Sequence, residues 1–277
     1  MIKDLSVTIL VDNRASENGA GTEHGLSLWI EADGFRLLFD TGQSDLMFRN
    51  GQLAGIDPAE ADVLVLSHGH YDHTGGVGSL LELRKDLPVY CHPGVVIPRY
   101  SRQSDGCMKP VGMSRSSAMA LMNREKNIIW VTRPQYITGH IGIVGVIPRT
   151  TDFEDTGGAF FGDPSGQSAD PIEDDTSLWI ETVRGIVVVT GCCHSGIVNT
   201  LLRIRQITGN NQFYRIIGGF HLVNAARSRL DATVAYLQAE RWDRMVPCHC
   251  TGEVAMRYLE QYFPDRMEAG FAGKEIR

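Results

Sequence analysis

The segment SHGHYDHTGG at residues 67–76 concentrates side chains that could bind a metal ion. Three histidines and one aspartate fall within six residues, namely His68, His70, Asp72 and His73. The chain of 277 residues contains only nine histidines, so this density needs a reason. Imidazole nitrogens bind zinc, iron or manganese, and a neighbouring carboxylate suits borderline or hard cations. The sequence therefore predicts a metal-binding segment here.

The spacing of these residues fits a loop that leaves the end of a strand. The apolar run DVLVLS at 62–67 predicts a buried strand. His68 and His70 are two residues apart, so in extended backbone their side chains point the same way. Asp72 and His73 follow as the chain turns toward a helix near Thr74. The alternative, polar residues that merely close a helix N-terminus, would leave three imidazoles that repel one another when protonated.

Other histidines follow other predicted strands. His194 comes after GIVVVT (185–190), His221 after FYRIIGG (213–219), and His249 after the short run RMVPC. If these strand ends meet at one edge, the three side chains join the 68–73 segment in a cleft. His194 and His249 are predicted ligands, and His221 is either a ligand or a proton-transfer group. We expect His92 and His140 to be structural.

The elements around these residues indicate a sheet-and-helix protein. Short apolar runs rich in β-branched residues predict strands, and four amphipathic stretches predict helices at 44–56, 195–207, 226–240 and 252–263. In the second helix, Ser195 is the predicted N-cap. No sequence repeat and no linker divides the chain, so we predict one domain spanning residues 1–277, with sheets covered by helices.

Two charged segments interrupt the pattern. Residues 99–126 carry six basic and two acidic side chains, and residues 151–175 carry eight acidic side chains and no Lys or Arg. Both could be solvated loops. We predict that residues 94–127 form a lid or insertion that brings cations to an anionic substrate, since Arg can grip phosphate with two hydrogen bonds. The predicted substrate-binding cations are Arg102, Lys109, Arg115 and Arg149.

Composition excludes several classes of protein. The net charge of −7 argues against a general nucleic-acid binder. No apolar stretch approaches the roughly 20 residues of a membrane span. The six cysteines show no disulfide-framework spacing, which favours a reduced, cytoplasmic setting. We expect a small-molecule substrate and no membrane or nucleic-acid partner, and the sequence leaves a homo-oligomer open.

The segment His68-Gly-His70-Tyr-Asp72-His73 is similar to the HxHxDH motif of the metallo-β-lactamase superfamily. Phe39-Asp40-Thr41-Gly42 resembles the superfamily's first motif, whose Asp orients the metal-binding loop. The resemblance implies an α/β fold, the αββα metallo-β-lactamase sandwich. It also implies one or two divalent transition metals, with zinc preferred and iron or manganese as alternatives. Asp40, Asp72 and His221 are the expected catalytic residues. His24 resembles a position near the active site, where it would contact substrate; the alternative is a structural histidine of the core.

A narrower resemblance concerns the family of 7,8-dihydropterin-6-methyl-4-(β-D-ribofuranosyl)aminobenzene-5′-phosphate synthases. It rests on short segments shared along the chain, which are VDN (11–13), EHGLSLWIE (23–31), IPRTTDFE (147–154), TGCCHSGIVNTL (190–201), GGFHL (218–222) and PCHCTG (247–252). The resemblance implies either hydrolysis by a metal-activated water or a synthase that joins a dihydropterin to a ribofuranosylaminobenzene phosphate. A non-catalytic metal sensor and a diiron redox protein are further alternatives.

One departure from the superfamily pattern concerns the aspartate that commonly bridges two metals. The corresponding stretch reads Thr190-Gly191-Cys192-Cys193-His194 and contains no Asp. Either Cys192 or His194 takes its place, or the second metal has fewer protein ligands and binds more weakly. A separate structural zinc held by Cys192, Cys193, Cys248 and Cys250 is the less favoured alternative, because their spacing is unlike the common CxxC knuckle.

Overall fold

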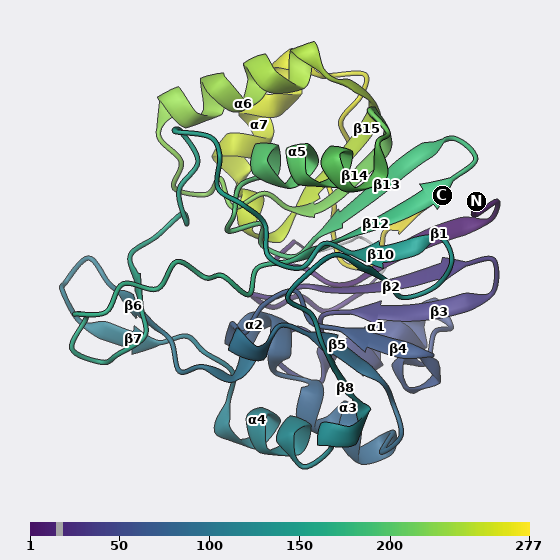
Figure 1. Cartoon of the computed structure of the whole chain (residues 1–277), viewed down its shortest axis with the longest axis vertical. Helices are drawn as coiled ribbons and strands as arrows, with labels where there is room; N and C mark the ends of the chain where they lie inside the picture. The colour runs from purple at the N-terminus through teal and green to yellow at the C-terminus, as the bar shows by residue number, and fades with distance from the viewer. Residues whose placement is uncertain (15–18) are drawn as a thin grey trace.

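The computed structural model describes residues 1–14 and 19–277 and has four layers. Two large sheets pack face to face in the middle, and helices cover the outer face of each, as Figure 1 shows. The N- and C-termini lie at the end of the sandwich away from a small hairpin that projects on the opposite side. The predicted αββα sandwich is confirmed.

The first large sheet has the strand order β16-β1-β2-β3-β4-β5-β8. Its antiparallel half joins β16, β1, β2 and β3, and its parallel half joins β3, β4, β5 and β8. The bounds are β1 Leu5–Val11, β2 Ser27–Ala32, β3 Phe35–Phe39, β4 Val63–Val65, β5 Val89–Cys91, β8 Ile128–Trp130 and β16 Glu275–Ile276. Parallel β3 and β4 therefore end at the same edge of the sheet.

The second large sheet has the order β15-β14-β13-β12-β10-β9. Strands β13, β14 and β15 are parallel, so their carboxyl ends also share an edge. The bounds are β9 Gln135–Tyr136, β10 Ile141–Ile143, β12 Ser177–Thr182, β13 Gly185–Thr190, β14 Gln212–Gly219 and β15 Arg241–Cys248. Strand β15 is longer than the short run that the sequence predicted, because its first half pairs with β14 while carrying charged side chains.

A third sheet, in the order β11-β6-β7, is the projecting hairpin and its partner strand. Its strands are β6 Tyr100–Arg102, β7 Met108–Pro110 and β11 Phe160–Phe161. The helices are α1 Leu46–Ala54, α2 Tyr71–Thr74, α3 Val77–Leu83, α4 Arg115–Met122, α5 Ile197–Thr208, α6 Arg227–Ala239 and α7 Glu253–Tyr262, with 3-10 turns η1 Pro58–Glu60, η2 Pro93–Val96, η3 Glu125–Asn127 and η4 His249–Thr251. Within the described residues no helix has the length and apolarity to cross a membrane.

Three apolar cores separate the four layers. One lies between the sheets and includes Ile9, Phe39, Val187 and Ile217. A second packs α1, α3 and α4 on the first sheet, and a third packs α5, α6 and α7 on the second. Burying a large aliphatic side chain stabilises the fold by roughly 1.5–3 kcal/mol. These cores hold the strand ends on which the polar loops stand.

The start of α5 differs from the prediction that Ser195 caps it. The N-cap is Gly196, and it is the Glu154 carboxylate that accepts hydrogen bonds from the Val198 and Asn199 amides at 2.9 and 2.8 Å. A side chain at Gly196 would collide with Glu154, since an added Cβ would lie 2.2 Å from the carboxylate carbon. The predicted cap was wrong because a carboxylate from a distant segment occupies that place.

Candidate metal centre

The polar loops that follow five strands meet at one edge of the sandwich. Strand β3 leads to Asp40 and β4 leads to His68, while β13 leads to Cys192, β14 to His221 and β15 to His249. All of these except His221 are buried. The sequence argument, that residues directly after strand ends meet at one edge, describes where these residues lie. Both sheets contribute residues to this edge.

The backbone bends sharply at several of these strand ends. Asp40, Cys193, His221 and His249 have positive φ angles of 61°, 63°, 44° and 48°. Left-handed backbone is unfavourable for residues with a Cβ, and such residues cluster at functional sites where the surrounding structure enforces them. The bends turn side chains from the strand direction into the space between the sheets.

Four of the histidine rings are held at Nδ1, which leaves Nε2 facing inward. His73 Nδ1 donates to Asp40 Oδ2 at 2.7 Å, and His194 Nδ1 donates to the Thr156 carbonyl at 2.8 Å. His249 Nδ1 donates to Asn13 Oδ1 at 2.8 Å. His68 Nδ1 lies 2.9 Å from Ser67 Oγ, whose own hydroxyl donates to Asp40 at 2.6 Å. Such partners fix the tautomer and orientation of metal-binding imidazoles.

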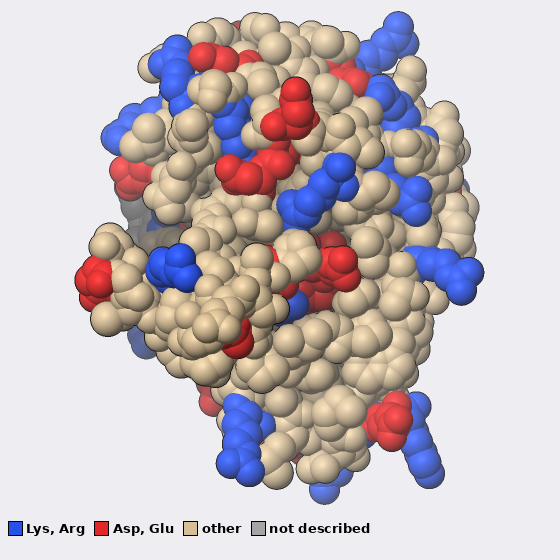
Figure 2. Space-filling view, turned by 60° about the vertical axis from the view of Figure 1, so that its left-hand side comes forward, with Lys and Arg blue, Asp and Glu red and all other residues tan. Residues whose placement is uncertain are grey.

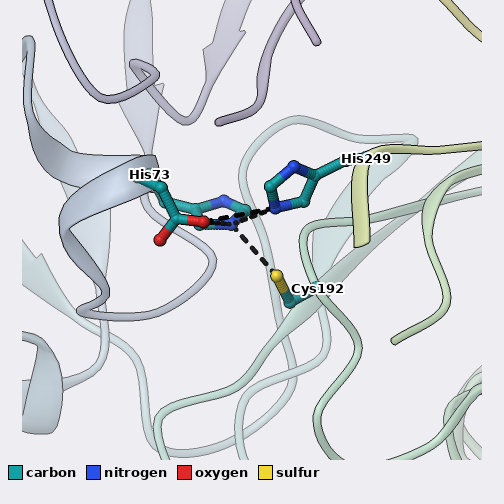
Figure 3. A group of neighbouring side chains, drawn as sticks. His73, Cys192 and His249 are labelled. Carbon is teal, nitrogen blue, oxygen red and sulfur yellow. Dashed lines mark hydrogen bonds and ion pairs between the residues drawn. The ribbon is translucent and has the colours of Figure 1, made fainter. Parts of the chain in front are cut away.

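The first group of inward-facing donors consists of Asp72, His73, Cys192 and His249. Figure 3 shows His73, Cys192 and His249 of this group pointing toward one another. His73 Nε2 lies 3.1 Å from Cys192 Sγ and 3.1 Å from His249 Nε2. Asp72 Oδ2 lies 3.7 Å from His73 Nε2 and 3.4 Å from His249 Nε2. A tetrahedral zinc with bonds of about 2.0–2.3 Å separates its ligands by roughly 3.3–3.8 Å. These four separations lie within a few tenths of an ångström of that range, and all donor atoms of the group lie within 4.8 Å of one another, so the four residues could hold one ion.

A second group joins His68, Cys192 and His194, with all donor atoms within 4.8 Å of one another. His70 adjoins it, because its Nδ1 lies 2.9 Å from His68 Nε2. The buried Nε2 atoms of His70 and His194 have no hydrogen-bond partner among the described residues. Buried polar atoms are normally satisfied, so these nitrogens fit a site built for a cation.

Burial keeps most of this imidazole cluster neutral. Desolvation and neighbouring imidazoles lower the pKa of His68 and His194 well below the ordinary range, and desolvation lowers the pKa of His70 to about 3. Burial also opposes charge on His73, but the Asp40 and Asp72 carboxylates raise its pKa to about 9. Neutral imidazoles present the lone pairs that metal coordination requires.

A cleft of about 540 Å³ opens over these donors. The third sheet forms one wall: Phe160 in β11 lies 5.1 Å from the His70 ring and 5.3 Å from the His194 ring, between centroids. The Arg102 guanidinium lies 4.4 Å above the Phe161 ring, and Arg102 lines the cleft. Lys109 lies over Tyr71, another lining residue, at 5.6 Å.

The other predicted cations lie elsewhere. Arg115 begins α4 in the outer helical layer and does not line the cleft. Arg149 donates to the His194 and Pro171 carbonyls, both at 2.5 Å, so it supports the loop that carries His194. On the face drawn in Figure 2, Lys and Arg side chains are interspersed with acidic ones.

The basic and acidic segments pair through a buried cluster. Arg99 donates to both oxygens of Asp174 at 2.7 and 2.8 Å and to Asp170 at 2.6 Å. The Gly69 amide, between His68 and His70, donates to the same Asp174 carboxylate at 2.8 Å. Part of the charge of both segments therefore forms ion pairs in the interior of the protein. The view that the acidic segment is simply solvated was wrong for Asp174, because Arg99 and Gly69 compensate its burial.

The remaining histidines fall into two classes. His24 lies in the cleft with its Nε2 3.1 Å from Asp72 Oδ2, and its side chain is 54% exposed. The hydrogen bond to Asp72 raises the pKa of His24. His92 accepts from the Gly94 amide, and His140 pairs with Glu181, so both have structural contacts away from the donor groups.

Sequence reasoning assigned no role to several supporting residues. Asp12 accepts from the His249 amide at 2.7 Å, and Asn13 holds the His249 ring. Both residues directly follow β1, whose end lies at the same edge. The argument used for the histidines, that residues after strand ends gather at one edge, would therefore have identified them. The Thr156 carbonyl carries no such signal, because any residue type supplies a backbone oxygen.

Comparison with known proteins identifies the family. A family model for the metallo-β-lactamase superfamily matches residues 20–201. A Methanocaldococcus jannaschii protein named 7,8-dihydropterin-6-methyl-4-(β-D-ribofuranosyl)-aminobenzene-5′-phosphate synthase is 28% identical, with 100% of this chain and 97% of that protein aligned. An uncharacterized protein of the same organism is 30% identical over 98% of this chain and 99% of its own.

Solved structures agree with this assignment. The crystal structure of Tm1679, a metal-dependent hydrolase of the β-lactamase superfamily, matches with a TM-score of 0.83 and 28% identity over 99% of both chains. Zn²⁺-bound PqqB from Methylobacterium extorquens shares the fold, with a TM-score of 0.55 and 15% identity over 98% of this chain and 99% of its own. The chain belongs to the metallo-β-lactamase superfamily.

Proposed function

We propose that this protein is a metal-dependent hydrolase that acts on a small anionic substrate. The observation that carries the proposal is the convergence of buried Nε2 atoms whose rings are each fixed at Nδ1 by a protein acceptor. That arrangement suits one or two transition-metal ions, with zinc preferred, because imidazole with thiolate or carboxylate is a typical zinc donor set.

His68, His70 and His194 would hold one ion, and Asp72, His73 and His249 the other. A bound ion supplies Lewis acidity, which lowers the pKa of water toward ~7 and polarises a carbonyl or phosphoryl oxygen. His24 Nε2 contacts Asp72 Oδ2, the same carboxylate oxygen that faces His73 and His249, so His24 would orient this donor. The His221 Nδ1 atom has no hydrogen-bond partner among the described residues, so it is available to transfer a proton.

The walls of the cleft support a small anionic substrate. Arg14 and Arg102 line the cleft, and Lys109 lies near its Tyr71 wall. Phe160 offers an apolar surface beside His70 and His194. The volume of about 540 Å³ suits a small molecule. A phosphate would supply the negative group and a pterin-like ring the flat, partly apolar body, so a phosphorylated pterin-like compound matches both features.

A second candidate function is that of a synthase. The observation that favours it is the full-length similarity, at 28% identity, to the protein named as 7,8-dihydropterin-6-methyl-4-(β-D-ribofuranosyl)-aminobenzene-5′-phosphate synthase. The same donors and the same anion-facing side chains would serve a condensation. The two functions differ in the reaction, so assays of hydrolysis and of formation of that named product distinguish them.

The experiment combines elemental analysis with a reaction panel. Freshly purified protein should contain one to two equivalents of transition metal, and should turn over at least one phosphate ester, phosphodiester, carboxylic ester or dihydropterin substrate. The His68→Ala, His70→Ala double variant should lose the ion that these two histidines would hold, and with it most of the activity. The matched control is His92→Ala, His140→Ala, which removes two histidines outside the donor groups and should keep both. Full metal in the first variant would contradict the proposal, and full metal without turnover would favour a sensor.

A further inference from the structure

Cys192 belongs to both groups of donors. Its Sγ lies within 4.8 Å of the donor atoms of Asp72, His73 and His249, and also within 4.8 Å of those of His68 and His194. The side chain is buried, with 3% of the residue exposed. A single sulfur atom thus stands between the two places where ions would bind.

The fold directs this sulfur inward and its neighbour outward. Gly191 at the end of β13 is pressed against the metal-binding loop, since an added Cβ would lie 2.1 Å from Ser67 Oγ. Cys193 then adopts a φ of 63°, and its Sγ contacts Thr200 Oγ1 at 3.2 Å in the core beneath α5. Two adjacent cysteines therefore have opposite environments, one facing the donors and one facing the core.

We propose that the Cys192 thiolate bridges the two metal ions, in the role that an aspartate carboxylate commonly has in the superfamily. A thiolate has more than one lone pair and can bind two cations through one atom, and its proton leaves to solvent when the ions bind. Soft sulfur selects zinc or cobalt over magnesium or calcium. The inference rests on the proposed metal-dependent function and specifies its ligand set.

Cys250 is the competing source of sulfur. Its thiol donates to the Cys192 carbonyl at 3.4 Å, and its Sγ forms a third group with Cys192 and His221. Cys250 belongs to neither of the first two groups, whereas Cys192 belongs to both. Cys250→Ser should therefore leave the bridge in place, whereas Cys192→Ser should remove it.

The test uses cobalt(II) added stepwise to metal-free protein. Both the first and the second equivalent should add near-ultraviolet thiolate-to-cobalt absorption, and the doubly loaded protein should show magnetic coupling between the two ions. Cys192→Ser should lose the absorption and the coupling. Cys192→Asp should bind two ions through oxygen without the absorption. Cys193→Ser is the matched control, since the adjacent core-facing sulfur is removed, and it should behave like the unmodified protein.

Several results would overturn the bridge. Absorption that rises with only one equivalent would mean a terminal thiolate, and absorption that survives in Cys192→Ser but not in Cys250→Ser would transfer the role to Cys250. Two bound ions with no thiolate absorption would also refute it while leaving the metal-dependent function intact. If the unmodified protein binds no cobalt or zinc, the proposed function itself fails. The measurements on unmodified protein decide the question even if a variant does not fold.

Discussion

Asp40 connects two of the three histidines that follow β4, His68 and His73. One carboxylate oxygen accepts from His73 Nδ1 and from the Ser67 hydroxyl, and the other accepts from the Ser67 amide at 2.7 Å. The Ser67 hydroxyl in turn lies against His68 Nδ1. Asp40 is therefore a positioning residue for both rings, and its charge supports the basicity of His73.

Asp40→Asn should weaken metal binding by about 10–100-fold, the usual effect of losing a partner behind a metal-bound histidine. The amide keeps the size of the side chain, but its NH₂ group cannot accept from His73. The dissociation constant for zinc, measured by competition with a chromophoric chelator, checks this expectation.

Asp33→Asn is a matched control for that variant. Asp33 also has a positive φ, 48°, and its carboxylate accepts from backbone amides far from the donor groups. The control should bind zinc as the unmodified protein does. Equal zinc affinities in all three proteins would refute the positioning role of Asp40.

At the scale of elements, the 94–127 segment divides into parts with different positions. The β6–β7 hairpin joins β11 at the mouth of the cleft, whereas α4 packs beside α3 in the outer layer. The lid stays a prediction, and within this segment the hairpin is the part that lies at the cleft, where a lid would act. Arg102 is the hairpin cation that lines the cleft, and Arg115 belongs to the helix.

Arg102→Ala should raise the KM for a phosphorylated substrate about tenfold, which corresponds to ~1.4 kcal/mol. The reason is the loss of one charge-assisted contact, and metal content should not change. Steady-state kinetics on a phosphorylated substrate and on a neutral ester of similar shape provide the measurement.

Arg115→Ala removes the same charge from the same segment and should leave both KM values unchanged. If Arg102→Ala raised the KM for the neutral ester as much as the KM for the phosphorylated substrate, the hairpin would act through its shape and not through its charge. If Arg102→Ala and Arg115→Ala changed the KM values equally, the distinction between a hairpin that binds substrate and a helix α4 that does not would be refuted.

At the scale of the whole molecule, the donor groups join the two sheets. His68, His70, Asp72 and His73 follow β4 of the first sheet, and Cys192, His194 and His249 follow β13 and β15 of the second. Ions bound between them would link the two halves of the sandwich, in addition to the apolar core that the sheets share.

Removal of metal should therefore lower the melting temperature. An ion present at about 1,000 times its dissociation constant stabilises the folded state by roughly 4 kcal/mol. For a domain of this size that corresponds to a shift on the order of 10 °C. Thermal unfolding followed by circular dichroism, with chelator and then with zinc restored, measures the shift and its reversal.

The His68→Ala, His70→Ala variant supplies the control, since chelator should change its melting temperature much less. A chelator effect of the same size in that variant would show that the stabilising ion is bound elsewhere. No effect in the unmodified protein would show that the sheets are held by their apolar core alone.

The sequence by itself determined the class of fold and the edge at which the candidate metal donors lie. Apolar runs rich in β-branched residues, such as LSVTILV and GIVVVT, are stable as buried strands. They form β1 and β13, and β13 has the predicted bounds 185–190. Polar residues directly after parallel strands must share an edge, because the strands run in the same direction. The histidine spacing is likewise local, so it is visible in ten residues.

Tertiary structure alone decided which of two adjacent cysteines faces the donors, and which charges are free for a ligand. The direction of Cys192 depends on the bend at Cys193, which is set by packing beneath α5. The pairing of Arg99 with Asp174 joins residues 75 positions apart. Such contacts arise from the packing of distant segments, and no local periodicity or residue preference encodes which side chain will meet which.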